Sequence, residues 1–193
     1  MVAPEAEAML PSVRRFTPTL SRDARGGRGS ILFALLLVVQ AADGEPLKNH
    51  YNDPFMQVTN GIAACPPPRG PFLTVKEAQA EAHPRIERGT TCFMAGKCVE
   101  PNAYRYDAGI AKAAQEAVAS EVQKTPALAR SSVWLTVQRR FVFVQGCVTR
   151  KSDVMRWERM LKAVPDVEYV GADLATGMRA ADFRRVRYPL MPL

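Results

Sequence analysis

The stretch that decides the fold is SSVWLTVQRRFVFVQGCV, residues 131–148. Its first half alternates Val133, Leu135 and Val137 with larger or polar side chains, and its second half, from Phe141 to Val148, is again β-branched and aromatic. This period of two predicts two strands joined by a tight turn at Arg139-Arg140. Two-residue hairpin turns favour Asn-Gly, so we expect this turn to include neighbouring residues as well.

The segments on either side of this hairpin predict two helices and one more strand. Asp107 is expected to cap a helix from Ala108 to about Gln123, which Pro126 ends. Ser152 is expected to cap a second helix through Val164 with one apolar face, and residues 167–174 alternate as a third strand. The predicted order is helix, strand, strand, helix, strand.

The chain ahead of residue 107 has a different character. Residues 42–73 are rich in Pro and Gly, which predicts an extended or coiled segment. A capping box of Thr74 and Glu77 then predicts a helix from about Val75 to Arg88, with a kink or a late start at Pro84. Residues 90–106, which contain Cys92 and Cys98, are expected to form a disulfide-braced loop.

Residues 107–174 resemble the BON domain family. The resemblance rests on the apolar helix before the hairpin, on Val142-x-Val144-x-Gly146-x-Val148, and on the closing run Val164-Pro165-Asp166-Val167-Glu168-Tyr169-Val170. It departs from the family at Asp166, where Gly is usual, and at Arg139-Arg140, where the turn generally contains Gly.

This resemblance implies an α+β fold with a small three-stranded sheet and two helices in the order αββαβ, here with an N-terminal helical or coiled extension braced by disulfides. It also implies an exported or envelope-associated protein that binds phospholipid or membrane surfaces. BON modules often occur in pairs, whereas one copy is present here.

The N-terminal segment has the features of an export signal. A basic lead with five Arg precedes the apolar run Ile31 to Val39, and small residues follow it, so we expect cleavage after Ala41. The apolar run holds about a dozen residues, fewer than the roughly 20 that a membrane-spanning helix needs, so an uncleaved anchor is the less favoured alternative. The protein is therefore expected to be periplasmic or secreted.

These patterns divide the chain into four segments, and the formal charge of +7 falls to +5 when residues 1–41, with five Arg and three acids, are removed. The segments are a signal peptide at 1–41, a Pro-rich and Cys-containing extension at 42–106, the BON-like domain at 107–175 and a basic tail at 176–193.

All four cysteines follow the signal, and an even number in an oxidising compartment predicts two disulfides. Three pairings are open, and we expect Cys92 to bond Cys98 and Cys65 to bond Cys147. Zinc is the competing interpretation, but the spacing of Cys92 and Cys98 does not suit it, and the two histidines, His50 and His83, have no companion ligands nearby.

The face of the hairpin opposite the predicted helices carries Phe141, Phe143, Gln145 and Cys147. Residues 50–105 are expected to fold over it, with Cys147 as a covalent tie; a docking surface for a partner is the alternative.

The tail combines Arg179, Arg184, Arg185, Arg187 and Tyr188, which could touch anionic lipid headgroups. A solvated, partly disordered tail is the favoured interpretation.

No phosphate-binding loop, metalloprotease motif or nucleophile elbow is found, so we expect no enzyme and no cofactor. Four carboxylates are interpreted as caps or loop anchors: Asp53, Glu100, Asp107 and Asp153. Export and dispersed charge disfavour a nucleic-acid partner. Two function classes remain: a module that binds membrane phospholipid or an envelope partner, and an assembly subunit of an envelope or secretion complex that does not bind lipid.

Overall fold

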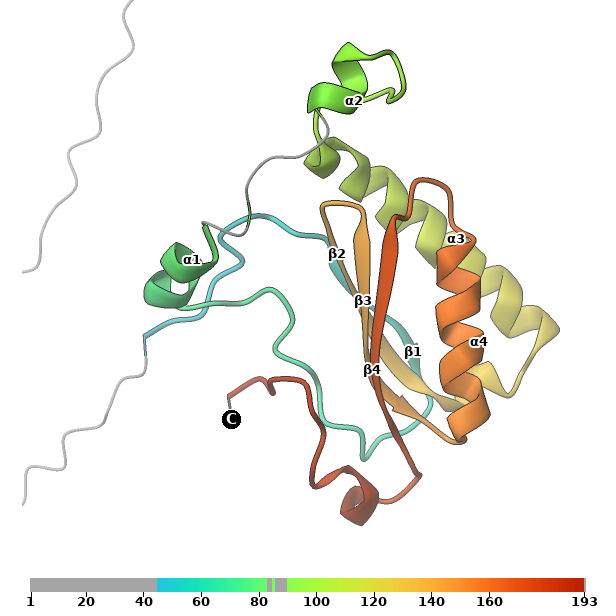
Figure 1. Cartoon of the computed structure of the whole chain (residues 1–193). Helices are drawn as coiled ribbons and strands as arrows, with labels where there is room; N and C mark the ends of the chain where they lie inside the picture. The colour runs from blue at the N-terminus through green and yellow to red at the C-terminus, as the bar shows by residue number, and fades with distance from the viewer. Residues whose placement is uncertain (1–44, 83–84, 86–89, 193) are drawn as a thin grey trace, which may run out of the picture. The chain divides into compact units, whose positions relative to one another are not determined.

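A computed structural model describes residues 45–82, 85 and 90–192. Its centre is a mixed sheet with the strand order β1-β2-β3-β4, shown in Figure 1. The strands β1 (Phe55–Asn60), β2 (Ser132–Gln138) and β3 (Phe141–Val148) pair antiparallel, and β4 (Tyr169–Thr176) lies parallel to β3. The predicted hairpin and the strand after the second helix are confirmed.

Two long helices lie on one face of this sheet (Figure 1). They are α3 (Asp107–Lys124) and α4 (Lys151–Lys162), close to the helices that the sequence predicts. Shorter helices are α1 (Val75–Ala82), α2 (Thr90–Met94) and the 3₁₀ turns η1 (Ala103–Tyr106), η2 (Leu128–Arg130) and η3 (Ala180–Phe183).

The core between helices and sheet follows the predicted period of two. Val142, Val144 and Val148 of β3 are fully buried against Trp157 and Leu161 of α4. Burying an aliphatic or aromatic side chain of this size stabilises the folded state by about 1.5–3 kcal/mol each, so this layer is the main source of stability in the α+β unit.

The expectation of three strands is wrong, because β1 adds a fourth strand within the Pro-rich extension. Residues 55–60 contain no Pro, and they occupy a sheet edge, where only one side of the strand needs ladder donors. Met56 and Val58 of β1 pack on the core. The sequence did not predict this strand, because the many Pro residues in 42–73 indicated a coiled segment.

The β2–β3 turn shows how the chain tolerates Arg-Arg at a two-residue hairpin. Arg139 and Arg140 both have positive φ, 54° and 68°, a conformation that costs a non-Gly residue roughly 1–2 kcal/mol. The Asp107 carboxylate accepts hydrogen bonds from both backbone N–H groups, at 2.7 and 2.8 Å. The register pairs Gln138 with Phe141, so the turn contains only these two residues and does not include its neighbours as expected. Asp107 supports it from outside the hairpin.

This role replaces the one predicted for Asp107. The residue does not cap α3; Tyr106 occupies the N-cap position, and Asp107 lies buried in the first helical turn. Burial raises the pKa of the Asp107 carboxyl, and the two turn N–H groups act in the opposite direction. A carboxylate 32 residues before Arg139 thus links the start of α3 to the hairpin.

The turn after α4 also contains a residue with a positive φ. Asp166 has a φ of 66°, a left-handed conformation that Gly adopts freely. Its carbonyl accepts a hydrogen bond from Arg140 Nε at 2.8 Å, and the Arg140 guanidinium lies 4.8 Å from the centre of the Tyr106 ring. Arg140 therefore supports both unusual turns.

Other local predictions are corrected at helix starts and ends. The described part of the first helix ends at Ala82; Pro84 and His83 lie outside the described residues. The expected loop over 90–106 contains α2 and η1. Ser152 does not cap α4: Arg150 is the N-cap residue, and Asp153 accepts from its backbone N–H at 3.2 Å.

The sheet face opposite α3 and α4 is covered by both the extension and the tail. A second, smaller core forms there from Ile62 and Cys65 of the extension, Cys147 of β3 and Phe183 of the tail. The sulfurs of Cys65 and Cys147 are bonded, as expected, and so are those of Cys92 and Cys98. The described residues between 45 and 192 form one compact unit, and the predicted signal at 1–41 lies outside the described residues.

Replacing Asp107 tests the support of the hairpin turn. We expect Asp107→Ala to lower the free energy of unfolding by about 2–4 kcal/mol, because two backbone N–H groups lose their acceptor in a part-buried position. Glu116→Ala, which removes an exposed carboxylate from the same helix, should change it by less than about 0.5 kcal/mol. Urea unfolding of both variants measures the difference, and equal effects would contradict this role.

Replacing each cysteine pair separately tests how much each disulfide contributes. Cys65 and Cys147 are 82 residues apart and Cys92 and Cys98 are 6 apart, so the first bond restricts the unfolded chain more. We expect the double Ser variant of Cys65 and Cys147 to lose about 3–5 kcal/mol of unfolding free energy, and that of Cys92 and Cys98 about 2 kcal/mol. Denaturant unfolding without reductant gives both values; a larger loss for the second pair would refute the assignment.

Candidate binding surface

Each of the four carboxylates singled out in the sequence has a structural partner. The Asp53 carboxylate forms a buried pair with Arg85, with Nη1–Oδ1 and Nη2–Oδ2 distances of 3.1 and 2.7 Å. Asp107 holds the hairpin turn, Asp153 holds the start of α4, and Glu100 lies 3.8 Å from the Arg105 guanidinium. They act as anchors, as the sequence suggested.

The buried pair of Asp53 and Arg85 also fastens the extension. Arg85 Nε donates to Glu81 at 3.0 Å, and its guanidinium lies 3.8 Å from the centre of the Tyr51 ring. Removing one member of such a buried pair leaves an uncompensated charge, which is strongly destabilising. This geometry indicates a structural role for the Asp53–Arg85 ion pair.

The described residues contain no group of three or more His, Cys, Asp or Glu side chains that could hold a metal ion. His50 Nε2 lies 3.0 Å from the Leu73 carbonyl oxygen, and His83 is outside the described part of the chain. Among the same residues no helix is long and apolar enough to cross a bilayer.

The tail from residue 177 is packed onto the sheet by two aromatic anchors. Phe183 is buried in the small core with Cys65 and Cys147, and Tyr188 is only 3% exposed. The Tyr188 hydroxyl donates to the Pro66 carbonyl at 3.0 Å and lies 3.7 Å from Cys65 Sγ. Farther along, the Arg69 N–H donates to the Pro189 carbonyl at 2.7 Å. The interpretation of this segment as a freely solvated tail is therefore wrong.

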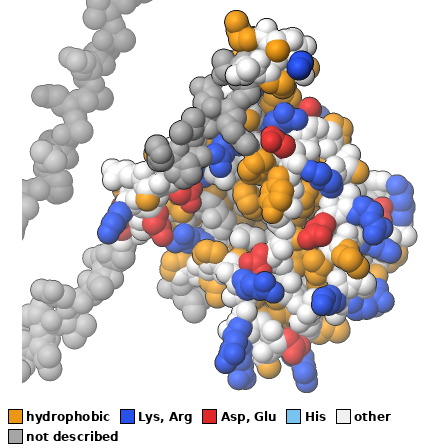
Figure 2. Space-filling model, viewed as in Figure 1, with side chains coloured by type: hydrophobic (Ala, Val, Ile, Leu, Met, Phe, Trp, Pro, Cys, Tyr) orange, Lys and Arg blue, Asp and Glu red, His pale blue; other side chains and the backbone are white. Residues whose placement is uncertain are grey.

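Between and beside these anchors the tail presents exposed cations. Arg184, Arg185 and Arg187 are exposed and form no ion pair within the described residues, whereas Arg179 lies 3.4 Å from Asp182. Met178 is 65% exposed in the same segment. Figure 2 shows Lys and Arg side chains projecting at the lower end of the molecule, where η3 lies in Figure 1.

A groove beside the edge strand β4 continues this surface. It has a volume of about 690 Å³ and lies between α4 and β4, with Met155, Leu174 and Arg187 among its lining residues. Lys151 at the start of α4 lines it as well, so the groove brings a helix cation and a tail cation together. We call the exposed Arg184, Arg185 and Arg187 with Lys151 and Met178 the basic end.

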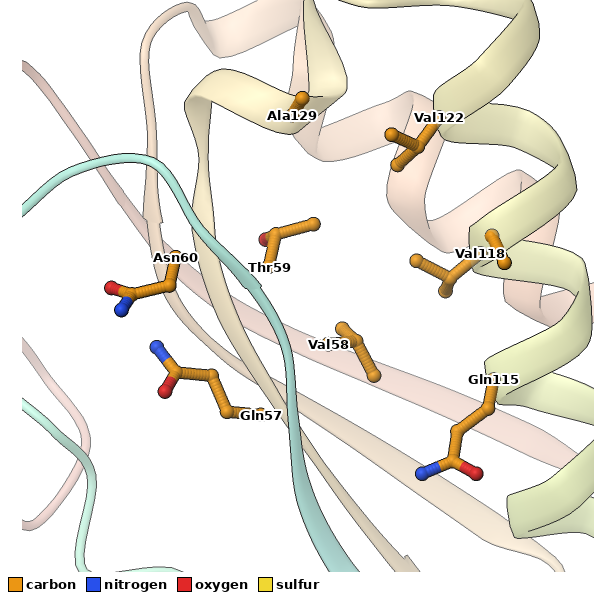
Figure 3. Close-up of a pocket in the computed structure, with 9 residues that line it drawn as sticks. Gln57, Val58, Thr59, Asn60, Gln115, Val118, Val122 and Ala129 are labelled. Atoms are coloured by element: carbon orange, nitrogen blue, oxygen red, sulfur yellow. The ribbon is translucent and has the colours of Figure 1, made fainter.

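A second groove, of about 450 Å³, lies at the other sheet edge. Figure 3 shows Val58 of β1 facing Val118 and Val122 of α3, with Gln57 and Gln115 at the margin. Its described lining carries no charged side chain, which distinguishes it from the groove beside β4.

The five residues predicted to touch lipid are not all on the surface. Four arginines are exposed, but Tyr188 is removed from the group because its ring and hydroxyl are used inside the molecule. The sequence reasoning missed Lys151, which was placed ahead of the helix, and Met178. The signal for Met178 was present, since it is an apolar residue that directly precedes Arg179.

The pH dependence of stability tests the anchoring of the tail. Burial raises the pKa of Tyr188 to about 12 from its ordinary value of 10.0. Above pH 10 the unfolded chain loses this proton before the folded chain does, so the free energy of unfolding should fall between about pH 10 and 12. Tyr188→Phe lacks the titrating group and should not show this fall. Urea unfolding of both proteins at pH 9 and pH 11 measures it, and parallel losses would contradict it.

Comparison of the chain with protein-family models, with curated protein sequences and with solved structures gives no significant match.

Proposed function

We propose that this protein is an exported, non-enzymatic binding module that attaches peripherally to anionic phospholipid surfaces through its basic end. The observation that carries the proposal is the ordered tail, whose buried Phe183 and Tyr188 hold exposed arginines outward. The resemblance to BON domains agrees with this function, and we infer a BON-like module on the same residues, 107–174.

The chemistry of the basic end suits a lipid surface. Each Lys or Arg near an anionic bilayer contributes about 1 kcal/mol of attraction, and an exposed apolar side chain can insert among the acyl chains. Arg184 and Arg185 supply unpaired charge, and Met178 supplies the apolar group. Because Phe183 fixes the segment, binding does not have to order it, so less conformational entropy is lost.

Two features support export. Both cysteine pairs are bonded, which fits an oxidising, non-cytoplasmic compartment. We further infer that residues 1–41 are the signal peptide and that the mature protein acts in the periplasm or outside the cell.

Vesicle co-sedimentation tests the proposed attachment. We expect the exported protein to sediment with vesicles that contain phosphatidylglycerol and not with pure phosphatidylcholine, and salt should weaken the binding because exposed charges are screened. The double variant of Arg184→Gln and Arg185→Gln should bind at least about tenfold more weakly, since two surface cations are lost. The matched control replaces the exposed Lys76 and Lys112 by Gln and should bind as the wild type does.

Equal binding of the two double variants would show that attachment depends on net charge and not on the basic end. A protein that ignores both kinds of vesicle but co-purifies with a specific envelope complex would overturn the lipid proposal and favour the assembly subunit instead.

A further inference from the structure

Strand β4 forms a free edge of the sheet. Within the described chain β4 pairs only with β3, and the Gly177 N–H donates to the Val148 carbonyl just beyond the paired register. By alternation, residues 170, 172, 174 and 176 turn their N–H and C=O groups away from β3. Such an edge is a template for another strand unless it is blocked by charge, Pro or a bulge.

The flank of α4 that lines the groove beside this edge has a self-complementary order. Lys151, Met155 and Glu158 follow one another at spacings of four and three, so they lie along one face of the helix. Met155 is 59% exposed, and neither Lys151 nor Glu158 forms an ion pair within the described residues. Opposite charges at similar distances on either side of an apolar centre suit a two-fold contact, in which the same patch meets itself.

We propose that two copies of this chain associate through this surface, with β4 pairing antiparallel to β4 of the second copy and α4 packing across the two-fold axis. The two four-stranded sheets then join into one of eight strands. Lys151 meets Glu158 of the partner copy, and Met155 packs against its own equivalent on the axis.

The register follows from charge and from length. An axis at Asp173 would place two carboxylates directly opposite each other, which is destabilising. An axis at Leu174 instead pairs Asp173 with Ala175 and Ala172 with Thr176. α4 runs antiparallel to β4 (Figure 1), and Lys151 to Glu158 spans about 10 Å of helix while Ala172 to Thr176 spans about 13 Å of strand. The two centres, Met155 and Leu174, can therefore lie at the same level.

The opposite edge is a weaker candidate for this contact. The groove beside β1 is uncharged along its described lining, so it offers no pair of charges to fix an orientation (Figure 3). Lys151 belongs to both surfaces, so self-association is separated from lipid binding by Glu158→Lys, which leaves every residue of the basic end unchanged.

Sedimentation equilibrium of the exported, oxidised protein tests the proposal. We expect a dimer with a dissociation constant on the order of micromolar. Lys151→Glu and Glu158→Lys should each weaken it at least about tenfold, since like charges then meet at both symmetric contacts. The double variant of Lys151→Glu and Glu158→Lys should restore the wild-type constant within about threefold, because the pair is reversed and not removed. Lys112→Glu, the same charge change on the exposed side of α3, should have no effect.

Three results would overturn the proposal. The first is a wild-type protein that stays monomeric well above micromolar concentration. The second is a dimer that neither single charge reversal weakens, which would place the contact elsewhere. The third is a double variant as weak as the single variants, which would show that these charges do not face each other. Circular dichroism of each variant confirms that it is folded.

Discussion

The structure depends on the junction at the Cys65–Cys147 bond, because this sheet has two apolar faces and the long helices cover only one. Three parts of the chain meet at this bond. The extension contributes Cys65, β3 contributes Cys147, and the tail contributes Phe183 and Tyr188. A bare three-stranded hairpin module would leave an aromatic face open to water, which invites association or aggregation. The covalent tie and the two aromatic anchors close this face within one chain.

Buried polar interactions also join distant parts of the chain. Asp107 and the pair of Asp53 and Arg85 each bind groups that are far away in the sequence, and each is buried. Buried charges that are fully hydrogen-bonded specify one arrangement of the chain more than they add to its stability. Here they fix where α3 meets the hairpin and where the segment just before β1 meets the segment after α1.

The sequence predicted the elements whose pattern is local and periodic. The hairpin, α3, α4 and β4 follow from alternation and from helical spacing, whereas the disulfide pairing was one choice among three that the sequence left open. It did not reveal β1, since six residues among prolines carry a weak pattern and become a strand only when β2 accepts them. The sequence reasoning placed Tyr188 on the surface and did not include Lys151 in the basic end. Both errors have the same cause, because the burial of Tyr188 and the position of Lys151 beside Arg187 depend on residues more than 30 positions away.

The order in which the cysteines occur has a consequence for how the protein matures. If the chain crosses the membrane from its N-terminus, as we propose, Cys65 emerges first and Cys92 and Cys98 follow well before Cys147. An oxidant that joined cysteines as they appeared would couple Cys65 to Cys92, which is not the native bond. The correct bond has to wait until β3 has been translocated and has paired with β2. Yield in the exporting cell should therefore be limited by disulfide isomerisation and not by the rate of oxidation.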